Sequence, residues 1–305
     1  MIPYFYIIAG PTGIGKSSFS LKLAKQLNGN IINADSMQVY KELRILTARP
    51  NKEEEKIIEH HLYGYVYGNE RYNVERWCND ASKKIIHCQK NNTIPILVGG
   101  TGMYIDKLIN GIVNIPTTPE HLKLESENLL QKKGLKNFYN LINEFDSLSL
   151  KKINANDTSR LRRIWEVYNN TGKTFSEWNA SEPKKFLKKI KYKLILFLPD
   201  RKKNYQKVNS RFFSMFDQGV TEEVKELLKL NLNSSLPIMK AHGVPEIKNY
   251  LDAKIDKDSC IELGQKVTRN YVKRQHTWWN SSKLQIFKKF NQFPHELDPN
   301  SMNFS

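Results

Sequence analysis

Eight residues near the start of the chain have the types and spacing of a phosphate-binding loop. In order they are Gly10, Pro11, Thr12, Gly13, Ile14, Gly15, Lys16 and Ser17, which is the pattern G-x-x-x-x-G-K-S. An apolar run precedes this loop and a helix-like run follows it, which is the context that the motif requires. Glycines let backbone N–H groups turn toward a phosphate, and the start of a helix adds partial positive charge. We therefore expect Lys16 to bind an outer phosphate and the Ser17 hydroxyl to ligate Mg²⁺.

Three further residues are placed for chemistry on that phosphate. Asp35, Thr101 and Arg201 each follow a different apolar segment. Ligands of open parallel sheets bind at the carboxyl ends of the strands, so we expect these residues at one edge with the loop. Asp35 could ligate Mg²⁺ through water, act as a general base or cap a helix. Arg201 could bind diphosphate oxygens bidentately or lie on the surface at a turn.

The segments that must position these residues indicate an α/β fold. Residues 4–9, 30–34, 94–98 and 194–198 are apolar strand candidates. Helix-like segments around them favour parallel strands with crossover helices. Two amphipathic stretches follow, at residues 208–230, interrupted near Gly219, and at residues 261–279. We predict a P-loop NTPase-like parallel sheet flanked by helices, with a helical insertion domain.

The domain boundaries are predicted from changes in composition. A linker-like Pro-Thr-Thr-Pro stretch begins at Pro116, and a charged helical pattern follows it. Within that pattern, Asp157 is expected to begin a helix and Gly172 to end it. We predict a catalytic core of residues 1–115 and 192–290 with a helical C-terminal part. The insertion domain would comprise residues 116–191, and residues 291–305 would be a frayed tail.

Composition bounds the partners and the compartment. The net charge is +17, from 48 Lys and Arg against 31 Asp and Glu. Seven Lys or Arg and no acid lie between Glu262 and Glu296, beside several aromatic residues. Such clustering is typical of a nucleic-acid partner. No apolar stretch is long enough to cross a membrane. The three cysteines have no metal-binding spacing and fit a reduced cytoplasmic compartment.

Further motifs resemble those of the tRNA dimethylallyltransferase family, also called the isopentenyl-tRNA or IPP transferase family. They extend over most of the chain. Besides the phosphate loop they are Asp35-Ser36-Met37-Gln38-Val39-Tyr40, Thr47-Ala48-Arg49-Pro50, Leu97-Val98-Gly99-Gly100-Thr101-Gly102, and Thr268-Arg269 with Lys273-Arg274-Gln275 and Thr277-Trp278. The phosphate loop by itself indicates only a superfamily, whereas the other motifs in this order are far more specific.

The resemblance implies transfer of a dimethylallyl group from its diphosphate to N6 of adenine 37, beside the tRNA anticodon. The products would be N6-dimethylallyladenosine and diphosphate, with Mg²⁺ as the cofactor. Loop amides, Lys16 and Arg201 would stabilise the departing diphosphate. Asp35 would be the general base, and Thr101 would orient the adenine, which must leave the anticodon stack.

The resemblance also implies a surface for the tRNA anticodon stem-loop. Its residues would be Asp35, Ser36, Met37, Gln38, Thr101, Lys123, Ser159, Arg160, Leu161, Arg162, Arg163, Lys240, Ala241, His242, Gly243, Arg269, Lys273 and Arg274. We expect a monomer with no membrane partner.

The chain departs from the family pattern at a few positions. Leu46 stands where the family usually has Gly, Arg49 replaces Lys, and His61 replaces a frequent Arg. Val244-Pro245 replaces a common Tyr-Arg, which affects the expected tRNA contact next to Gly243. Two other functions remain open on the residues alone. They are a small-molecule or nucleotide kinase and a nucleotide-gated RNA-binding protein without enzymatic activity.

Overall fold

The computed structural model describes residues 4–188 and 191–301. The chain divides into two compact units. The core unit combines Met1–Ile109 with Phe186–Ser305, and the insertion unit is Asn110–Lys185. The predicted insertion boundaries were 116 and 191. In the structure both boundaries lie about six residues closer to the N-terminus than predicted. The two connecting segments belong to the insertion unit, where Ile112 and Lys184 pair in an antiparallel β-bridge.

The core unit contains a six-stranded parallel sheet, which confirms the predicted α/β class. The strand order is β3-β2-β4-β1-β5-β6, and every pairing described between these strands is parallel. The strands are β1 (Tyr4–Ala9), β2 (Gly29–Asn33), β3 (His60–His61), β4 (Ile94–Gly99), β5 (Lys191–Phe197) and β6 (Lys288–Phe290). The central strand β1 is almost entirely apolar because both faces of this sheet are covered.

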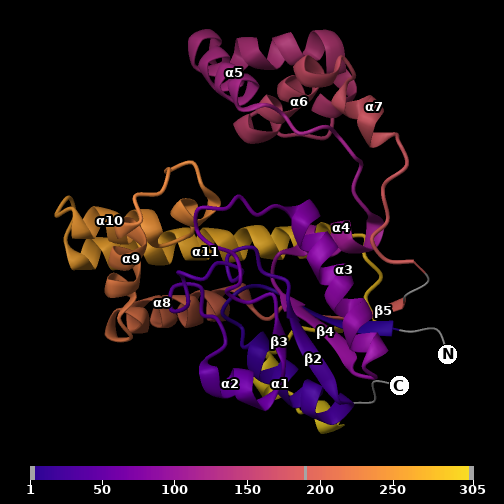
Figure 1. The fold of residues 1–305 in the computed structure, drawn as a ribbon. Helices are drawn as coiled ribbons and strands as arrows, with labels where there is room; N and C mark the ends of the chain where they lie inside the picture. The colour runs from indigo at the N-terminus through magenta and orange to yellow at the C-terminus, as the bar shows by residue number, and fades with distance from the viewer. Residues whose placement is uncertain (1–3, 189–190, 302–305) are drawn as a thin grey trace. The chain divides into compact units, whose positions relative to one another are not determined.

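Helices cover the sheet and extend beyond it (Figure 1). Those that precede the insertion are α1 (Lys16–Leu27), α2 (Lys52–Ile57), α3 (Val74–Lys90) and α4 (Gly102–Asn110). Those that follow it are α8 (Arg201–Asp217), α9 (Val220–Lys229), α10 (Val244–Leu251) and α11 (Lys257–Ser281). The break between α8 and α9 falls at Gly219, whose φ of 90° is left-handed, as the sequence predicted. Helices α8 and α11 run side by side.

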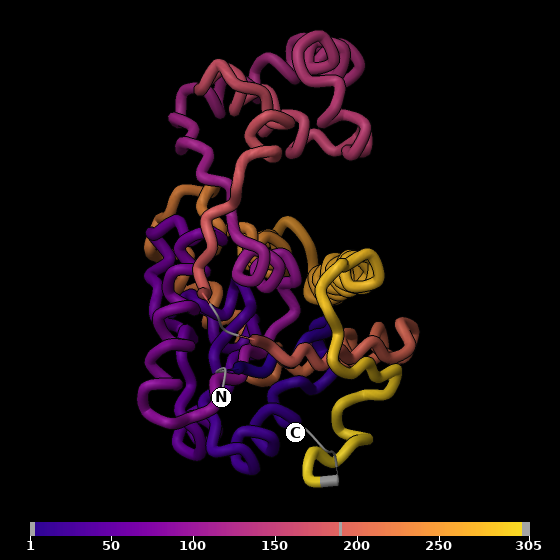
Figure 2. The backbone as a smooth tube through the Cα atoms, turned by 90° about the vertical axis from the view of Figure 1, so that its right-hand side faces the viewer, coloured from indigo at the N-terminus to yellow at the C-terminus, as the bar shows by residue number. Residues whose placement is uncertain are grey.

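The C-terminal segment differs from the prediction of a helical region followed by a frayed tail. β6 adds a strand beside β5, where the rings of Phe197 and Phe290 stack with centroids 5.3 Å apart. Phe293 is buried in the core against α1 and β1 residues. Two 3-10 turns, η2 (Pro294–Glu296) and η3 (Pro299–Ser301), then contact α1. Figure 2 follows this yellow segment along the core unit. Residues 302–305 lie outside the described residues.

The insertion unit is helical, as the sequence predicted. It contains α5 (Glu120–Leu150), α6 (Thr158–Thr171) and α7 (Phe175–Asn179). Non-helical backbone at Gly134 and Asp146 interrupts α5. Asp157 caps α6 by accepting a hydrogen bond from Arg160 N, and Gly172 ends it in the left-handed region. The core of this unit is apolar and includes Phe138, Ile142, Leu161 and Ile164.

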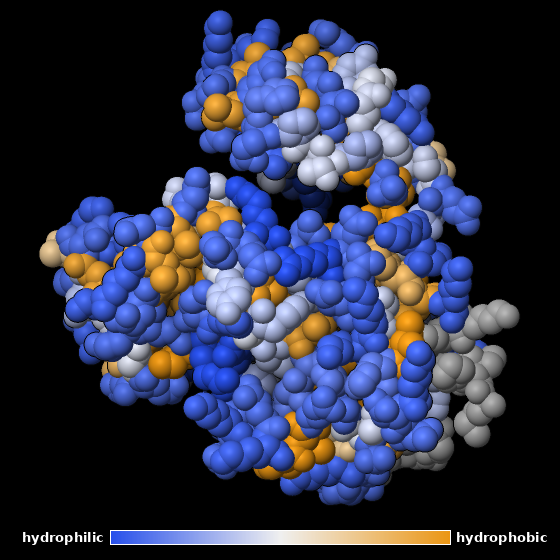
Figure 3. All heavy atoms as spheres, viewed as in Figure 1, coloured by the Kyte–Doolittle hydropathy of each residue, from blue (hydrophilic) through white to orange (hydrophobic). Residues whose placement is uncertain are grey.

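On the face drawn in Figure 3, hydrophilic residues predominate and hydrophobic ones form small groups. Among the residues that the structure describes, no helix is long and apolar enough to cross a bilayer. The three cysteines, Cys78, Cys88 and Cys260, are free and buried.

Candidate active site

The phosphate-binding loop has a backbone that only glycine tolerates. Gly13 and Gly15 have φ angles of 80° and 91°, and Gly15 immediately precedes α1. A Cβ on Gly10 would lie 2.3 Å from the Phe197 carbonyl oxygen. A Cβ on Gly13 would lie 2.4 Å from Val208 Cγ1. Because β5 and α8 pack this closely against the loop, its amides can curl around an anion at the start of α1.

Lys16 is held inside the loop. Its Nζ atom donates a hydrogen bond to the Pro11 carbonyl oxygen over 2.7 Å. Burial lowers the pKa of Lys16 to about 7, although the charge of Asp35 opposes this shift and Arg211 adds to it. A bound phosphate would restore the favourable surroundings of the ammonium form. The loop therefore presents a cation that an anionic ligand would keep charged.

The loop opens into a cavity of about 250 Å³, which we call the phosphate bay. Its lining consists of Thr12, Gly13, Gly15, Lys16, Ser17, Asp35, Gln38, Ala48, Tyr63, Val98, Gly99, Gly100 and Arg211. The lining thus joins the ends of three adjacent strands, β2, β4 and β1.

An arginine that the sequence did not indicate reaches this bay. Arg211 donates from Nη2 to the Thr12 hydroxyl over 3.0 Å and lines the bay. The predicted Arg201 is ten residues earlier on α8, exposed, with its guanidinium 5.9 Å from the Tyr205 ring centroid. Arg201 does follow β5 at the expected edge, but α8 carries its side chain away from the lining. A usable signal was the stripe Val208, Arg211, Phe212 and Met215, in which one arginine shares a helix face with apolar residues.

Asp35 both fixes a turn and presents its carboxylate to the phosphate bay. Its Oδ1 atom accepts hydrogen bonds from Met37 N at 2.8 Å and Gln38 N at 3.3 Å. The turn after β2 is thereby fixed, and the carboxylate lines the bay. The sequence weighed a helix cap at this position, but the next helix, α2, begins only at Lys52, so the carboxylate caps a turn instead. Its charge also stabilises protonated Lys16 and Arg211.

Thr101 and Gln275 connect three parts of the site. The Thr101 hydroxyl oxygen lies 3.3 Å from Ser36 N, so it accepts from the turn that carries Asp35. Gln275 accepts from Thr12 N over 2.8 Å and donates to the Gly100 carbonyl oxygen over 3.0 Å. Gln275 is therefore a link from α11 to the phosphate loop and to the turn after β4. From the sequence, Gln275 is recognised only as part of a family motif, without a role of its own.

A second, mainly apolar cavity of about 310 Å³ adjoins the bay. Its apolar residues are Met37, Leu46, Val208, Phe212, Met215 and Ala241. Its polar residues are Thr12, Asp35, Ser36, Thr47, Arg211, Lys240, His242, Thr268, Tyr271 and Arg274. Thr12, Asp35 and Arg211 line both cavities, so a ligand could place its anionic end in the bay and its apolar part here.

Several residues predicted to contact RNA gather at this apolar cavity. Ser36, Met37, Lys240, Ala241, His242 and Arg274 line it. The Nη2 atom of Arg274 lies 3.1 Å from His242 Nε2, and burial, with this nearby charge, lowers the pKa of His242. Gly243 caps α10, and Gln38 donates to the Thr47 and Ala48 carbonyl oxygens. Away from the cavity, Arg269 donates to Asn209 Oδ1 over 2.9 Å, and Lys273 is exposed on α11.

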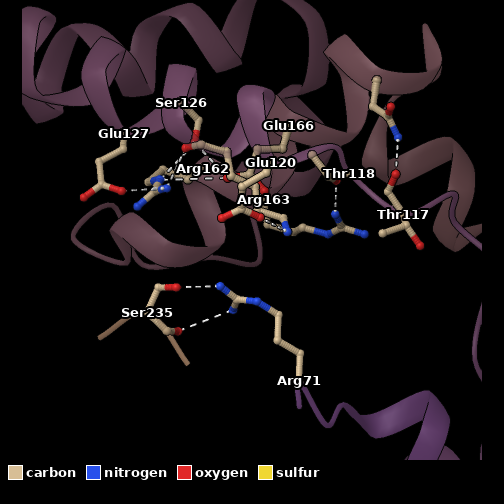
Figure 4. A network of polar contacts seen from close by, with 12 residues as sticks. Arg71, Thr117, Thr118, Glu120, Ser126, Glu127, Arg162, Arg163, Glu166 and Ser235 are labelled. Carbon is tan, nitrogen blue, oxygen red and sulfur yellow. Dashed lines mark hydrogen bonds and ion pairs between the residues drawn. The ribbon is translucent and has the colours of Figure 1, made fainter. Parts of the chain in front are cut away.

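The residues of the insertion unit that are predicted to contact tRNA differ in their exposure and in their hydrogen-bond partners. Arg160 and Ser159 are exposed on α6. Arg162 donates to Ser126 Oγ and to the Lys123 carbonyl oxygen and pairs with Glu127 (Figure 4). Arg163 donates to Thr118 Oγ1, and Lys123 pairs with Glu120 over 2.9 Å. The Leu161 prediction needs correction, because its side chain is fully buried in the apolar core and cannot contact RNA.

The bay offers oxygen ligands that suit Mg²⁺. They are the Ser17 hydroxyl and the Asp35 carboxylate, both in the lining. In the described ranges 4–188 and 191–301, no group of three or more His, Cys, Asp or Glu could enclose a metal. Mg²⁺ retains water and commonly binds through one or two protein oxygens together with substrate phosphates. The residues present therefore fit a magnesium ion shared with a diphosphate.

Known proteins share both the sequence and the fold. A sequence model described as IPP transferase matches residues 38–282, and one described as isopentenyl transferase matches residues 3–63. A tRNA dimethylallyltransferase of Ehrlichia ruminantium is 41% identical over 95% of this chain and 93% of its own. One from Pelagibacter ubique is 43% identical over 89% of this chain and 87% of its own.

Solved structures agree with these sequence matches. The tRNA isopentenylpyrophosphate transferase of Bacillus halodurans superposes with a TM-score of 0.66 at 27% identity, over 94% of this chain and 89% of its own. A eukaryotic dimethylallyltransferase described as acting on tRNA gives a TM-score of 0.74 at 29% identity, over 90% of this chain and 69% of its own. With a glycine loop, a carboxylate and an adjoining apolar cavity at one sheet edge, and with matches over nearly its whole length, the chain belongs to the IPP transferase family.

Proposed function

We propose that this chain transfers a dimethylallyl group from dimethylallyl diphosphate to N6 of adenine 37 of tRNA. The observation that carries the proposal is the meeting of the phosphate bay and the apolar cavity at Thr12, Asp35 and Arg211. An allylic diphosphate is anionic at one end and apolar at the other, and the two cavities match these ends. The names of the relatives in the same family supply the reaction and the RNA substrate.

The reaction joins N6 to the first carbon of the allyl group. The N6 lone pair forms the new C–N bond, the C1–O bond breaks, and its electron pair leaves with the diphosphate. Loop amides, Lys16 and Arg211 stabilise the charge that builds on the leaving oxygens. The Ser17 hydroxyl would hold Mg²⁺, which would supply further neutralisation of that charge. Arg211 therefore takes the role that the sequence assigned to Arg201.

Asp35 removes the proton that N6 loses. The adenine amine is a weak nucleophile because its lone pair is delocalised into the ring, so loss of the proton must accompany attack. Oδ1 of Asp35 is engaged by the Met37 and Gln38 amides, and we assign proton transfer to Oδ2. Thr101 accepts a hydrogen bond from Ser36 N in the same turn and thereby helps to orient the Asp35 carboxylate toward the adenine.

The RNA partner is the anticodon stem-loop of tRNA. The cations at the apolar cavity, Lys240 and Arg274, offer contacts for phosphates beside the extruded adenine. Exposed Lys273 on α11 adds a cation to the core unit, and exposed Arg160 offers one on the insertion unit. The three free thiols suit a reducing compartment, so we assign the protein to the cytoplasm. Separately, we propose that it acts as a monomer.

The experiment that tests this function is mass spectrometry of tRNA after incubation with the protein and dimethylallyl diphosphate, with and without Mg²⁺. The expected result is one added dimethylallyl group at adenine 37, dependent on Mg²⁺. A parallel incubation with ATP and without RNA tests the kinase alternative. If a small molecule is phosphorylated and the tRNA stays unmodified, the protein is a kinase and not a prenyltransferase. If neither product forms, the protein is a binding protein without enzymatic activity.

A further inference from the structure

Tyr63 lines the phosphate bay but has no part in the reaction as described so far. It lies two residues after β3, the strand that pairs with β2 at the edge of the sheet. Ligands of open parallel sheets bind where the carboxyl ends of the strands meet. Tyr63 therefore adds a fourth strand end to a lining that already contains Lys16 and Asp35.

A buried asparagine fixes the backbone beside Tyr63 to the turn that carries Asp35. The side chain of Asn33 is fully buried. Its Nδ2 atom donates to the carbonyl oxygens of Leu62 and Asp35, over 3.0 Å in each case. Its Oδ1 atom accepts from Asp35 N over 2.8 Å. Because one amide holds both segments, the backbone of Tyr63 and that of Asp35 keep a fixed relative position.

The chain turns sharply on both sides of Tyr63. Leu62 has a φ of 65° and Gly64 a φ of 53°, both in the left-handed region. This region is unusual for leucine and costs free energy there. The Gly64 amide donates to the Gln38 carbonyl oxygen over 2.9 Å, which anchors the turn to the segment after Asp35. Strained backbone of this kind clusters at functional sites, where the surrounding structure maintains it.

The tyrosine side chain combines a packed ring with an unpartnered hydroxyl. Its ring packs against a core cluster that includes Ile14 and Phe19. The ring of His60 meets it edge to face, with centroids 5.6 Å apart. In the ranges 4–188 and 191–301 the Tyr63 hydroxyl has no hydrogen-bond partner, and it is not among the polar atoms sealed from solvent. The packing thus holds the ring and leaves the hydroxyl available to a ligand.

The charges that act on this hydroxyl place it on the side of the bay. Tyr63 also lines another cavity, together with charged residues of α3. Burial raises the pKa of Tyr63, and the charges of Asp35 and of Glu54 and Glu55 on α2 raise it further, whereas the α3 charges do not contribute. With its pKa above the ordinary value of 10.0, the hydroxyl stays protonated and can donate at neutral pH.

A neutral donor suits this place near Asp35. A cation here would favour the charged form of the Asp35 carboxylate and so make it a weaker base. A phenol can donate to an anion without adding charge. Hydrogen bonds to ionised acceptors are about twice as strong as those between neutral groups. A diphosphate oxygen in the bay is therefore a favourable partner for the Tyr63 hydroxyl.

We propose that Tyr63 is a further substrate-binding residue, whose hydroxyl donates a hydrogen bond to the diphosphate of the donor in the bay. This inference rests on the proposed function. The hydrogen bond forms with the bound donor and persists while the C1–O bond breaks. It adds to the contributions of the loop amides, Lys16 and Arg211, and no proton leaves the phenol.

Tyr63→Phe tests the proposal because it removes the hydroxyl and keeps the ring. Tyr67→Phe is the matched control, since Tyr67 is 56% exposed and lines neither the bay nor the apolar cavity. Calorimetric titration with inorganic diphosphate measures the dissociation constant for wild type and both variants. Steady-state kinetics with varied dimethylallyl diphosphate give KM and kcat. Filter binding measures the affinity for tRNA, and thermal unfolding verifies that each variant is folded.

We expect Tyr63→Phe to weaken diphosphate binding by about tenfold or more, because one hydrogen bond to a charged group is lost. KM for dimethylallyl diphosphate should rise in parallel, while tRNA affinity and thermal unfolding match wild type. Tyr67→Phe should match wild type in every measurement.

Unchanged diphosphate affinity in folded Tyr63→Phe overturns the assignment. A loss confined to tRNA binding overturns it too, because Tyr63 would then be an RNA contact. Both of these results leave the proposed function intact. If wild type itself transfers no dimethylallyl group, the proposed function fails and the inference fails with it, so the two failures are distinguishable.

Discussion

Arg211 donates a hydrogen bond to the Thr12 hydroxyl over 3.0 Å and thereby ties α8 to the phosphate loop. The Nε atom of the same guanidinium is buried and has no hydrogen-bond partner in the part of the chain that the structure describes. A buried donor without a partner is costly. A diphosphate oxygen in the bay would satisfy it, so ligand binding and the position of α8 are coupled through this residue.

Replacement of Arg211 tests this coupling. We expect Arg211→Lys to lower kcat for dimethylallyl transfer by about 10²-fold or more, because the planar donor pair at the leaving group is lost. Steady-state kinetics with varied donor would measure it. Arg201→Lys is the matched control and should change kcat little. Equal losses in both variants would return the catalytic role to Arg201.

Asp35→Asn separates the two roles of the carboxylate. An asparagine can still accept from Met37 and Gln38 through Oδ1, so the turn and tRNA binding should survive. Turnover should fall by about 10²-fold or more because the amide cannot take the N6 proton. Single-turnover kinetics and filter binding of tRNA measure the two effects. Turnover near the wild-type rate would show that another group is the base.

The pH dependence of diphosphate binding should reflect Lys16. Its pKa in the free protein is lowered to about 7 from an ordinary 10.5, so above pH 7 the folded protein carries a neutral amine. Diphosphate favours the ammonium form, and its affinity should therefore fall as the pH rises through 7. Calorimetric titration with diphosphate on both sides of pH 7 would detect this fall and the accompanying proton uptake.

The same shift affects folding stability. Between pH 7 and 10.5 the unfolded chain binds more protons at Lys16 than the folded protein does, so the free energy of unfolding should rise with pH in that window. Lys16→Met removes the group and should abolish this component of both pH dependences. If the variant and the wild type show the same pH profiles, the titrating group lies elsewhere.

Asn204 offers a prediction about stability alone. It is fully buried on α8, and neither side-chain amide atom has a partner among the described residues. Asn204→Leu should raise the free energy of unfolding by about 1–3 kcal/mol, because an unsatisfied buried amide is replaced by an apolar group of the same branching. Chemical denaturation measures it. Asn204→Asp should destabilise the fold, and a lower stability in the leucine variant would reveal a bound water that satisfies the amide.

The sequence determined the parts of the site that depend on local chain order. A G-x-x-x-x-G-K-S loop between a strand and a helix specifies its own geometry, because left-handed backbone at Gly13 and Gly15 follows from the residue types. Apolar runs separated by helical patterns likewise indicated a parallel sheet, whose strand ends bring Asp35 and Thr101 toward the loop. The caps of α6 at Asp157 and Gly172 are local signals of the same kind.

Only the tertiary structure decided which distant side chains complete the site. Arg201 and Arg211 share a helix, and the packing of α8 against the loop and α11 turns one into the solvent and the other into the bay. Phe293 and β6 join the core because a neighbouring strand accepts them, although their own segment is polar. Leu46 and Phe212 both line the apolar cavity and both approach Gly243, although the three residues are far apart in the chain. Such contacts join residues far apart in the chain, and no local pattern encodes them.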